Sequence, residues 1–317
     1  MNSKIAKLLL SLFILQALVN LIGALGPELG FDALWYHLTE AKLFLQNQSI
    51  VPIKGSLLYW SGLPRLIEII FALALKIWDE RLTKLLHYFA GLVSTYLIYK
   101  ISRKKYFHLA SLIASLLFYT TLLTGWLSTT AYIDLFVTLF FLAALNAQKY
   151  FQKIIYLVLL GATKLTAVPL GLAITLIPWS LLGLLPFMII NFLNFKNPFY
   201  PFLSNLNLTN QWFFNGFWFW LSRPIRIFID PAFRVGPIIL LLIILFRKKI
   251  NWQYLKKPLL IVFFFWWLGP GTGFGRFALP LLALLSITLA SLFQKKISKL
   301  AMALVLLQAI VGISLRV

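Results

Sequence analysis

The sequence contains no cysteine and very few acidic residues. The missing cysteine excludes disulfides, thiolate nucleophiles and Cys-ligated metal sites, and it says little about the compartment. Only 8 of the 317 residues are Asp or Glu, whereas 29 are Lys or Arg, which gives a net charge of +21. Such a charge would suit a nucleic-acid partner, but the basic residues are spread over many loops instead of forming one stripe. We therefore expect no nucleic-acid partner.

Charge of either sign is scarce, and long apolar runs take its place. The chain is 61% hydrophobic and 12% charged, with a mean hydropathy of +0.89, whereas an ordinary soluble domain is about 45 to 50% apolar. Many runs approach the ~20 residues that a helix needs to cross a ~30 Å hydrocarbon layer. They are continuous instead of alternating, which favours helices over a barrel. The sequence predicts an all-α, polytopic integral membrane protein with about 9 to 11 transmembrane helices.

The apolar runs define the candidate spans. They lie at about residues 8–25, 63–78, 82–100, 107–124, 131–147, 235–246, 258–270, 277–293 and 299–315. Between 154 and 193 several Gly and Pro residues interrupt the apolar pattern, so we expect short, broken helices there. The first run lacks a small-x-small cleavage site before Gly26-Pro27, and we interpret it as a retained signal anchor. We expect one membrane domain over residues 1–317, without a soluble C-terminal domain.

Basic clusters predict how the chain is oriented across the membrane. The positive-inside rule places the clusters at 102–105, 247–249 and 294–296 in the cytoplasm. The loops 26–62, 125–133, 194–234 and 269–276 then face outward. An odd number of crossings must separate residue 26 from residue 102, yet two apolar stretches lie between them. It stays open whether 63–78, which carries Glu68, crosses or lies in the outer interface.

The scarce acids gather on the outward side. Glu28, Asp32 and Glu40 lie in the first outer loop, in and beside the stretch FDALWYHLTEAKLFLQNQ. Leu34, Leu38, Ala41 and Leu45 recur there at helical spacing, which predicts an outer interfacial helix after the first span. Asp32 stands at the start of this helix. It is either an N-cap or a functional carboxylate, and spacing alone leaves both interpretations open.

Three further charged residues are anomalous for their positions. Asp134, in TAYIDLFVTLF, stands at the outer end of an apolar span, where a carboxylate is costly and indicates function unless it reaches the headgroups. Lys164, in GATKLTAVP, and Arg276, in GFGRFALP, are cations on the side that should be poor in them. Both suit an anionic group such as a lipid phosphate. For the loop arginines, Arg223, Arg226 and Arg234, ordinary contact with lipid headgroups is the simpler interpretation.

The aromatic stretch QWFFNGFWFWLSRP, residues 211–224, is either an interfacial belt or the lining of a groove for an isoprenoid tail or a sugar. Trp212 belongs to this stretch, and Tyr36 and Tyr200 are further candidates for a substrate groove. The histidines, His37, His87 and His108, are scattered and show no metal-ligand spacing. The sequence identifies no cofactor, and a divalent metal stays open although the ligand spacing does not support one.

These motifs, taken in order, resemble a known family. FDALWYHLTEAKLFLQNQ, TAYIDLFVTLFFLAAL, LGATKLTAVPL, NFKNPFYPFL and GRFALPLLALL resemble the GT-C superfamily of membrane glycosyltransferases. The nearest branch is the protein mannosyltransferase and aminoarabinose transferase type. The similarity is colinear over most of the chain, although each motif alone is weak.

The resemblance implies an activity. A glycosyltransferase of this kind moves a sugar from a polyprenyl-phosphate donor, of undecaprenyl or dolichyl type, to an acceptor on the extracytoplasmic face, with inversion. The matching positions are Asp32 as general base, Asp134 as a second acid, and Lys164 and Arg276 on the donor phosphate. Many members carry a second acid directly after the first, whereas Ala33 follows Asp32 here and Glu40 is the next acid. We expect the protein in the cell's cytoplasmic membrane, among membrane lipids, with its active site facing outward; the acceptor is a glycan, a lipid or a protein.

Two other function classes stay open. A transporter or flippase for a lipid-linked or small anionic substrate commonly shows internal repeats and polar sites near the bilayer midplane. This chain shows no repeat, and its informative charges are predicted on one face. A catalytically inactive relative that only binds the lipid carrier would keep the cations and tolerate loss of Asp32.

Overall fold

The computed structural model describes residues 2–53, 58–203, 217–269, 274–294 and 298–315, and all regular secondary structure in these ranges is helical. The α-helices are α1 (Asn2–Leu25), α2 (Leu38–Gln46), α3 (Leu66–Ile77), α4 (Glu80–Arg103), α5 (His108–Tyr119), α6 (Leu122–Leu127), α7 (Asp134–Asn146), α8 (Tyr150–Thr163), α9 (Leu185–Phe195), α10 (Phe217–Ile229), α11 (Ile238–Phe246), α12 (Lys256–Leu268), α13 (Leu279–Leu289) and α14 (Lys299–Ser314). The all-α prediction is confirmed.

Shorter helical turns connect these helices. One turn of π-helix, η1, covers Ala33–His37, and the remaining turns are 3₁₀: η2 (Tyr59–Gly62), η3 (Leu165–Ala173), η4 (Trp179–Leu184), η5 (Pro231–Phe233), η6 (Gly275–Ala278) and η7 (Ala290–Phe293). Proline explains several of the breaks, because it removes a backbone donor and clashes with the preceding turn. Pro169 lies in η3, and Pro280 stands in the first turn of α13, where it is tolerated.

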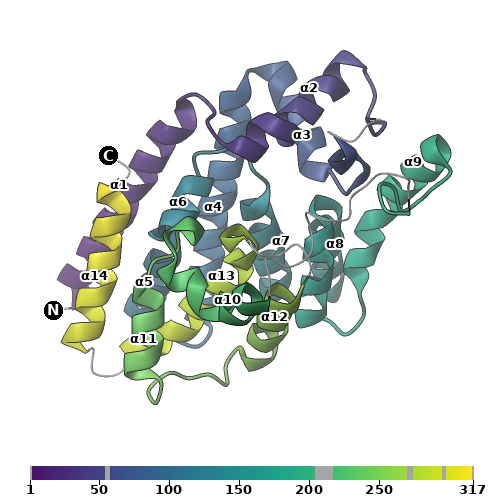
Figure 1. Cartoon of the computed structure of the whole chain (residues 1–317). Coiled ribbons are helices and arrows are strands. Elements are labelled where there is room, and N and C mark those ends of the chain that lie inside the picture. The colour runs from purple at the N-terminus through teal and green to yellow at the C-terminus, as the bar shows by residue number, and fades with distance from the viewer. Residues whose placement is uncertain (1, 54–57, 204–216, 270–273, 295–297, 316–317) are drawn as a thin grey trace.

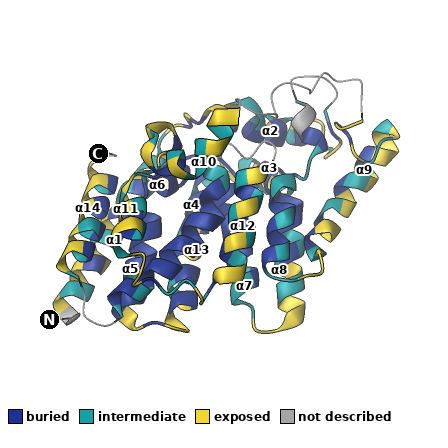
Figure 2. Ribbon diagram, turned by 60° about the horizontal axis from the view of Figure 1, so that its bottom comes forward, coloured by how far each residue is buried: buried dark blue, intermediate teal, exposed yellow. Residues whose placement is uncertain are grey.

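Helix α13 is the centre of the fold. Every residue from Leu279 to Leu289 is buried, and the helix packs against α4, α5, α7 and α12. Figure 2 shows the same pattern, with α13 and α5 mostly buried, whereas α4 and the peripheral helices also carry exposed residues. A helix that is apolar on all sides is stable only when it is surrounded by apolar neighbours.

Two pairs of helices close opposite edges of the bundle (Figure 1). Helices α1 and α14 pack side by side at one edge, although they come from the two ends of the chain. Helices α8 and α9 lie at the other edge. The outer face of α1 exposes large apolar side chains: Leu8, Leu10, Ile14, Leu15, Leu18 and Ile22. Such a continuous apolar face suits contact with lipid.

Helix length tests the predicted number of crossings only in part. Among the described residues, Lys4–Leu25 and Gly275–Phe293 are long and apolar enough to cross a membrane, and five shorter apolar helices accompany them. The predicted spans at 82–100, 131–147, 235–246, 258–270 and 299–315 each coincide with a helix. Their membrane crossings, like the total of 9 to 11, stay predictions.

The region 154–193 is broken, as predicted. Helix α8 ends at Thr163, and two 3₁₀ segments and α9 follow it. The last part of α8 packs backbone to backbone on η4. A Cβ atom at Gly161 would collide with the carbonyl oxygen of Ser180, and one at Gly183 would collide with the backbone of α8. Glycine is therefore required for this close approach.

Helical structure is found where the interfacial helix was predicted, as η1 and α2, and its position in the interface stays a prediction. Leu38 and Ala41 are buried, as the helical spacing predicts. Leu34 is 53% exposed, however, and Glu40 is only 1% exposed. The π-turn explains the first error, because its i to i+5 hydrogen bonding places Leu34 out of phase with the α-helical residues after it. Glu40 is buried because α2 packs against α3.

Candidate active site

Four charged residues from distant parts of the chain meet at one end of the bundle. Asp32 precedes η1, Asp134 is the first residue of α7, Lys164 follows the last residue of α8, and Arg276 lies in η6. The arrangement suits the helix dipoles at two of these positions. An anion is favoured at the N-terminus of α7, and a cation is favoured at the C-terminus of α8.

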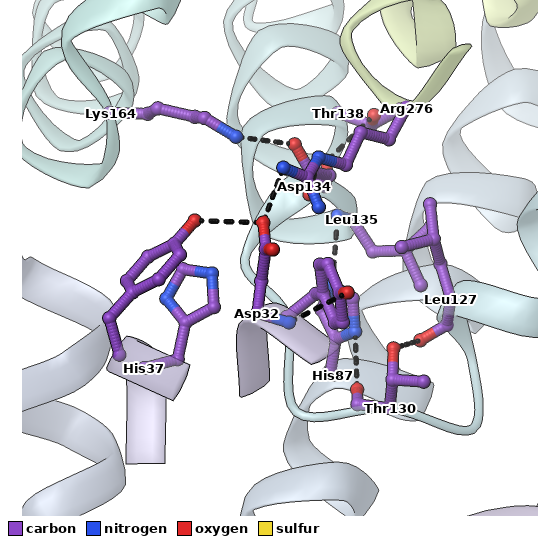
Figure 3. A network of polar contacts seen from close by, with 12 residues as sticks. Asp32, His37, His87, Leu127, Thr130, Asp134, Leu135, Thr138, Lys164 and Arg276 are labelled. Atoms are coloured by element: carbon purple, nitrogen blue, oxygen red, sulfur yellow. Dashed lines mark hydrogen bonds and ion pairs between the residues drawn. The ribbon is translucent and has the colours of Figure 1, made fainter. Parts of the chain in front are cut away.

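The four residues form one ion-paired network (Figure 3). Lys164 Nζ lies 2.7 Å from Asp134 Oδ1, and Arg276 forms an ion pair with Asp32 Oδ2. Arg276 Nε also lies 3.9 Å from Asp134 Oδ2, so the guanidinium bridges the two carboxylates. The network contains two anions and two cations and is electrically balanced. We call these four residues the charge quartet.

Aromatic rings surround the two cations of the quartet. Lys164 Nζ lies 4.1 Å from the ring centroid of Phe277, and the guanidinium of Arg276 lies 5.0 Å from that of Tyr132 and 5.4 Å from that of Phe277. Cations placed over aromatic faces are stabilised electrostatically. The rings therefore fix both cations at the boundary of the site.

Two tyrosines hold Asp32. The Tyr36 hydroxyl donates a hydrogen bond to Asp32 Oδ2 at 3.2 Å, and the backbone N–H of Asp32 donates to the Tyr132 hydroxyl at 3.1 Å. Burial raises the pKa of the Tyr36 hydroxyl well above its usual value of 10.0; Arg276 opposes this, and the Asp32 carboxylate adds to it. Burial also raises the pKa of Tyr132. Tyr36 therefore stays a protonated donor toward Asp32 at neutral pH.

His87 positions the start of α7 from the neighbouring helix α4. Its Nδ1 lies 2.9 Å from the carbonyl oxygen of Thr130, and its Nε2 lies 3.0 Å from the backbone nitrogen of Leu135. Because the Leu135 N–H must donate to Nε2, Nδ1 carries the proton and donates to Thr130. His87 thereby satisfies an N–H of the first turn of α7, the turn that begins with Asp134.

Glu28 and Lys84 join the loops that carry the two aspartates. Glu28 Oε1 accepts a hydrogen bond from the Gly30 N–H, and Oε2 accepts one from the Ala131 N–H, both at 2.6 Å. Lys84 Nζ donates to the carbonyl oxygens of Gly23, Gly26 and Pro27 at 2.7 to 3.0 Å. The two side chains thus fix the end of α1 and the loop after it on α4 and on the segment before α7.

Asp32 is not an N-cap, and Asp134 does not extend to the lipid headgroups. Asp32 occupies the cap position before η1, but its backbone is helical and its side chain caps no N–H in the described chain. Asp134 does not reach toward headgroups, since its side chain is 3% exposed and pairs with Lys164. Each carboxylate instead has a cation as partner.

The structure places Glu40 away from the quartet. Glu40 lies on α2, in a second buried cluster with Arg65, Glu68 and His37. Burial raises the pKa of the Glu40 carboxyl well above its usual 4.5, and the negative charge of Glu68 adds to this. The guanidinium of Arg65 lies 5.6 Å from the ring centroids of both Phe44 and Phe187. The catalytic role expected for Glu40 stays a prediction.

The remaining candidates are dispersed. Tyr36 joins the quartet, whereas Tyr200 stacks on Phe195 with ring centroids 4.1 Å apart, and Trp212 lies outside the described residues. Among the loop arginines, Arg226 pairs with Asp230, Arg234 lies over the ring of Trp126, and Arg223 donates to backbone carbonyls of α12. A groove role for Tyr200 and Trp212 stays a prediction.

Sequence reasoning missed two groups of residues: His87 and Tyr132, which support the quartet, and His37, Arg65 and Glu68 of the second buried cluster. The available signal was burial cost, because an ionisable residue inside an apolar run indicates a partner or a function. Two histidines were set aside because their spacing did not fit a metal site. Within the described part of the chain, no group of three His, Asp or Glu side chains is placed to hold a metal ion.

Comparison with known proteins gives a structural match. No protein-family model and no curated protein matches the chain by sequence. Among solved structures, the crystal structure of ArnT from Cupriavidus metallidurans bound to undecaprenyl phosphate matches with a TM-score of 0.63 at 14% sequence identity. The fold is GT-C-like.

The match covers 96% of this chain and 63% of the ArnT chain. This chain therefore spans a little under two thirds of that protein. The resemblance predicted from the sequence motifs is confirmed at the level of the fold, since ArnT is an aminoarabinose transferase of the GT-C type. At this identity the match shows the fold alone.

Proposed function

We propose that the protein is a glycosyltransferase that moves a sugar from a polyprenyl-phosphate donor to an acceptor at the outer face of the membrane. The charge quartet carries this proposal, because it joins in one place the carboxylate and the cations that such a reaction requires. The GT-C-like fold supports it, and the matched structure of ArnT was solved with undecaprenyl phosphate bound.

The cations of the quartet suit the donor. Lys164 and Arg276 bind the phosphate through charge-assisted hydrogen bonds, and they stabilise the charge that develops on it as it leaves. An entering phosphate competes with Asp32 and Asp134 for these cations. Donor binding thus frees the Asp32 carboxylate from Arg276 at the moment when a base is needed.

The reaction is a single displacement. Asp32 takes the proton from the acceptor's hydroxyl or amine, and the oxygen or nitrogen forms a bond to the anomeric carbon. The bond between that carbon and the phosphate oxygen breaks, and its electron pair leaves with the polyprenyl phosphate. One displacement inverts the anomeric configuration. Asp134 keeps Lys164 and Arg276 in place.

An apolar cavity offers room for part of a lipid tail. It has a volume of about 200 Å³, and its lining includes Ile227, Phe228, Phe263, Trp266, Leu281 and Leu285. Leu281 and Leu285 follow Arg276 by about one and a half and two and a half helical turns, which at 1.5 Å per residue corresponds to roughly 7 to 14 Å. A donor with its phosphate at Arg276 can therefore place its tail there.

The position of the quartet favours the transferase over a transporter. The quartet gathers at one end of the bundle, at the start of α7 and the end of α8, whereas transporter sites lie near the bilayer midplane. The outward orientation of the site belongs to this proposal.

Binding of polyprenyl-phosphate sugars to the purified protein, read by native mass spectrometry in nanodiscs, tests the proposal. We expect wild type and Asp32→Asn to retain the same donor, and Asp32→Asn to lose most of its turnover. Asp79→Asn, which changes an exposed carboxylate paired with Arg81, is the matched control. If no lipid with a phosphate head binds the wild type, the transporter interpretation replaces this one.

A further inference from the structure

His37 stands beside the quartet on the same helical turn as Asp32. In η1 the Leu38 N–H donates to the carbonyl oxygen of Ala33, which is the i to i+5 pattern of a π-helix. A turn of this width places residues four and five positions after Asp32 on the same side as Asp32. These residues are Tyr36 and His37. Figure 3 shows the Asp32 and His37 side chains both extending toward the side where Lys164 and Arg276 lie.

His37 is oriented by a buried carboxylate. Its Nδ1 lies 2.6 Å from Glu68 Oε1, and the two side chains are 1% and 5% exposed. The carboxylate fixes the tautomer, because it accepts the Nδ1 proton and leaves Nε2 with its lone pair. Within the residues that the structure describes, Nε2 is buried and has no hydrogen-bond partner.

The imidazole of His37 packs on both tyrosines that hold Asp32. Its ring centroid lies 4.1 Å from that of Tyr36 and 5.7 Å from that of Tyr132. These are the residues whose hydroxyl groups hydrogen-bond Asp32. The unpaired Nε2 therefore belongs to the immediate surroundings of the predicted base.

Each neighbouring element presents a titratable or charged group to His37. Glu68 comes from α3, Tyr36 from η1 and Tyr132 from the loop before α7. His87 comes from α4 and interacts electrostatically with His37. Behind Glu68 lie Glu40 of α2 and Arg65, whose charges act on each other and on Glu68. Glu68 is the one carboxylate among these groups that is hydrogen-bonded to His37.

We propose that the His37–Glu68 pair is a second base of this site, which takes the acceptor's proton at Nε2 in place of Asp32, while Glu68 stabilises the resulting imidazolium. The proposal rests on the transfer reaction proposed above. The proton moves from the acceptor's oxygen or nitrogen to Nε2, the new bond to the anomeric carbon forms, and the leaving electron pair goes to the phosphate. Asp32, already bound by Arg276 and Tyr36, and His37 thus provide two proton acceptors.

Release of the sugar from a bound polyprenyl-phosphate donor into water measures this function without knowledge of the acceptor. Asp32→Asn should keep a residual rate of sugar release. Adding His37→Gln to this variant should lower the residual rate by about a hundredfold, within the range of general base catalysis. His37→Gln alone should lower turnover by about tenfold. Donor binding should be unchanged in all three variants.

Two readouts separate a base from a merely structural histidine. Glu68→Gln keeps an acceptor for the Nδ1 proton but removes the charge, so the acid limb of the pH–rate profile should move by about one pH unit to lower pH. Added imidazole should partly restore turnover to His37→Gly. His108→Gln, which alters an exposed histidine hydrogen-bonded to Tyr99, is the matched control and should behave as wild type.

The proposal is overturned if Asp32→Asn and Asp32→Asn with His37→Gln turn over at the same rate. It is also overturned if Glu68→Gln leaves the acid limb in place and imidazole restores nothing. Failure of the wild type to bind any polyprenyl-phosphate donor would instead reject the transferase function itself.

Discussion

Arg276, near the C-terminal end of the chain, forms an ion pair with Asp32, near the N-terminal end. The same guanidinium reaches Asp134 at 3.9 Å, and Asp134 binds Lys164 at 2.7 Å. Arg276 therefore joins the first outer loop to the starts of α7 and α13. Substitutions at this residue test both the architecture and the chemistry of the site.

Arg276→Lys should weaken donor binding by about tenfold or more. A guanidinium offers five donors in a fixed plane and can hold a carboxylate and a phosphate together, whereas an ammonium acts as a point charge. Titration of a polyprenyl-phosphate lipid against the variant in nanodiscs measures the effect. Arg226→Lys, in the exposed pair with Asp230, should bind the donor as wild type does. Equal affinity in both variants would place the phosphate elsewhere.

Asp134→Asn should destabilise the fold. The side chain is 3% exposed and pairs with Lys164, and removing one partner of a buried ion pair costs about 3 to 5 kcal/mol because the other charge stays buried. The double variant Asp134→Leu with Lys164→Met should recover part of this loss. Thermal unfolding in one detergent compares the variants. A double variant that is less stable than Asp134→Leu alone and than Lys164→Met alone would contradict this account.

Glu40→Gln should gain stability relative to wild type as the pH rises. Burial raises the Glu40 pKa well above 4.5, so between these values the unfolded chain has lost the proton that the folded chain keeps. Stability from this group is therefore complete below about pH 4.5 and is lost as the pH rises toward the folded-state pKa. Gln carries no charge and removes this loss. Unfolding temperatures at pH 5 and pH 8 should show a larger difference between variant and wild type at pH 8.

Gly161→Ala should destabilise the edge of the bundle and weaken donor binding. The new methyl group would collide with the Ser180 carbonyl oxygen of η4, and overpacking of this kind costs about 1 to 3 kcal/mol. Lys164 follows directly after α8, so a shifted α8 displaces it. Gly26→Ala, whose Cβ would meet its neighbours at ordinary distances of 3.5 Å or more, is the control. Unfolding and donor titration on the same samples show whether stability and affinity fall together.

Much of the fold follows from the apolar runs. The helices at 80–103, 134–146, 256–268 and 299–314 fall where continuous apolar sequence predicts them, because a helix satisfies its own backbone in an apolar environment. The interruption after Thr163 follows from Gly and Pro. The π-turn at Ala33–His37 had no such signal, since tertiary contacts around Asp32 decide it.

The quartet was predictable in its members and not in its pairing. Asp134, Lys164 and Arg276 each violate the composition expected at their positions, and this identifies them singly. Their partners depend on how α7, α8 and α13 pack, which no local pattern contains. His37 and Glu68 escaped attention because each is an ordinary residue for its helix until burial and a 2.6 Å contact are known.

The balance of charge within the quartet has a consequence for selectivity. Lys164 and Arg276 are already neutralised by carboxylates that are tethered beside them, so a free anion must displace a competitor present at high effective concentration. Inorganic phosphate or a soluble sugar phosphate makes no additional contact that would favour this displacement. A ligand whose apolar tail is buried elsewhere in the protein gains binding energy from that tail, and the site thereby discriminates against water-soluble phosphates.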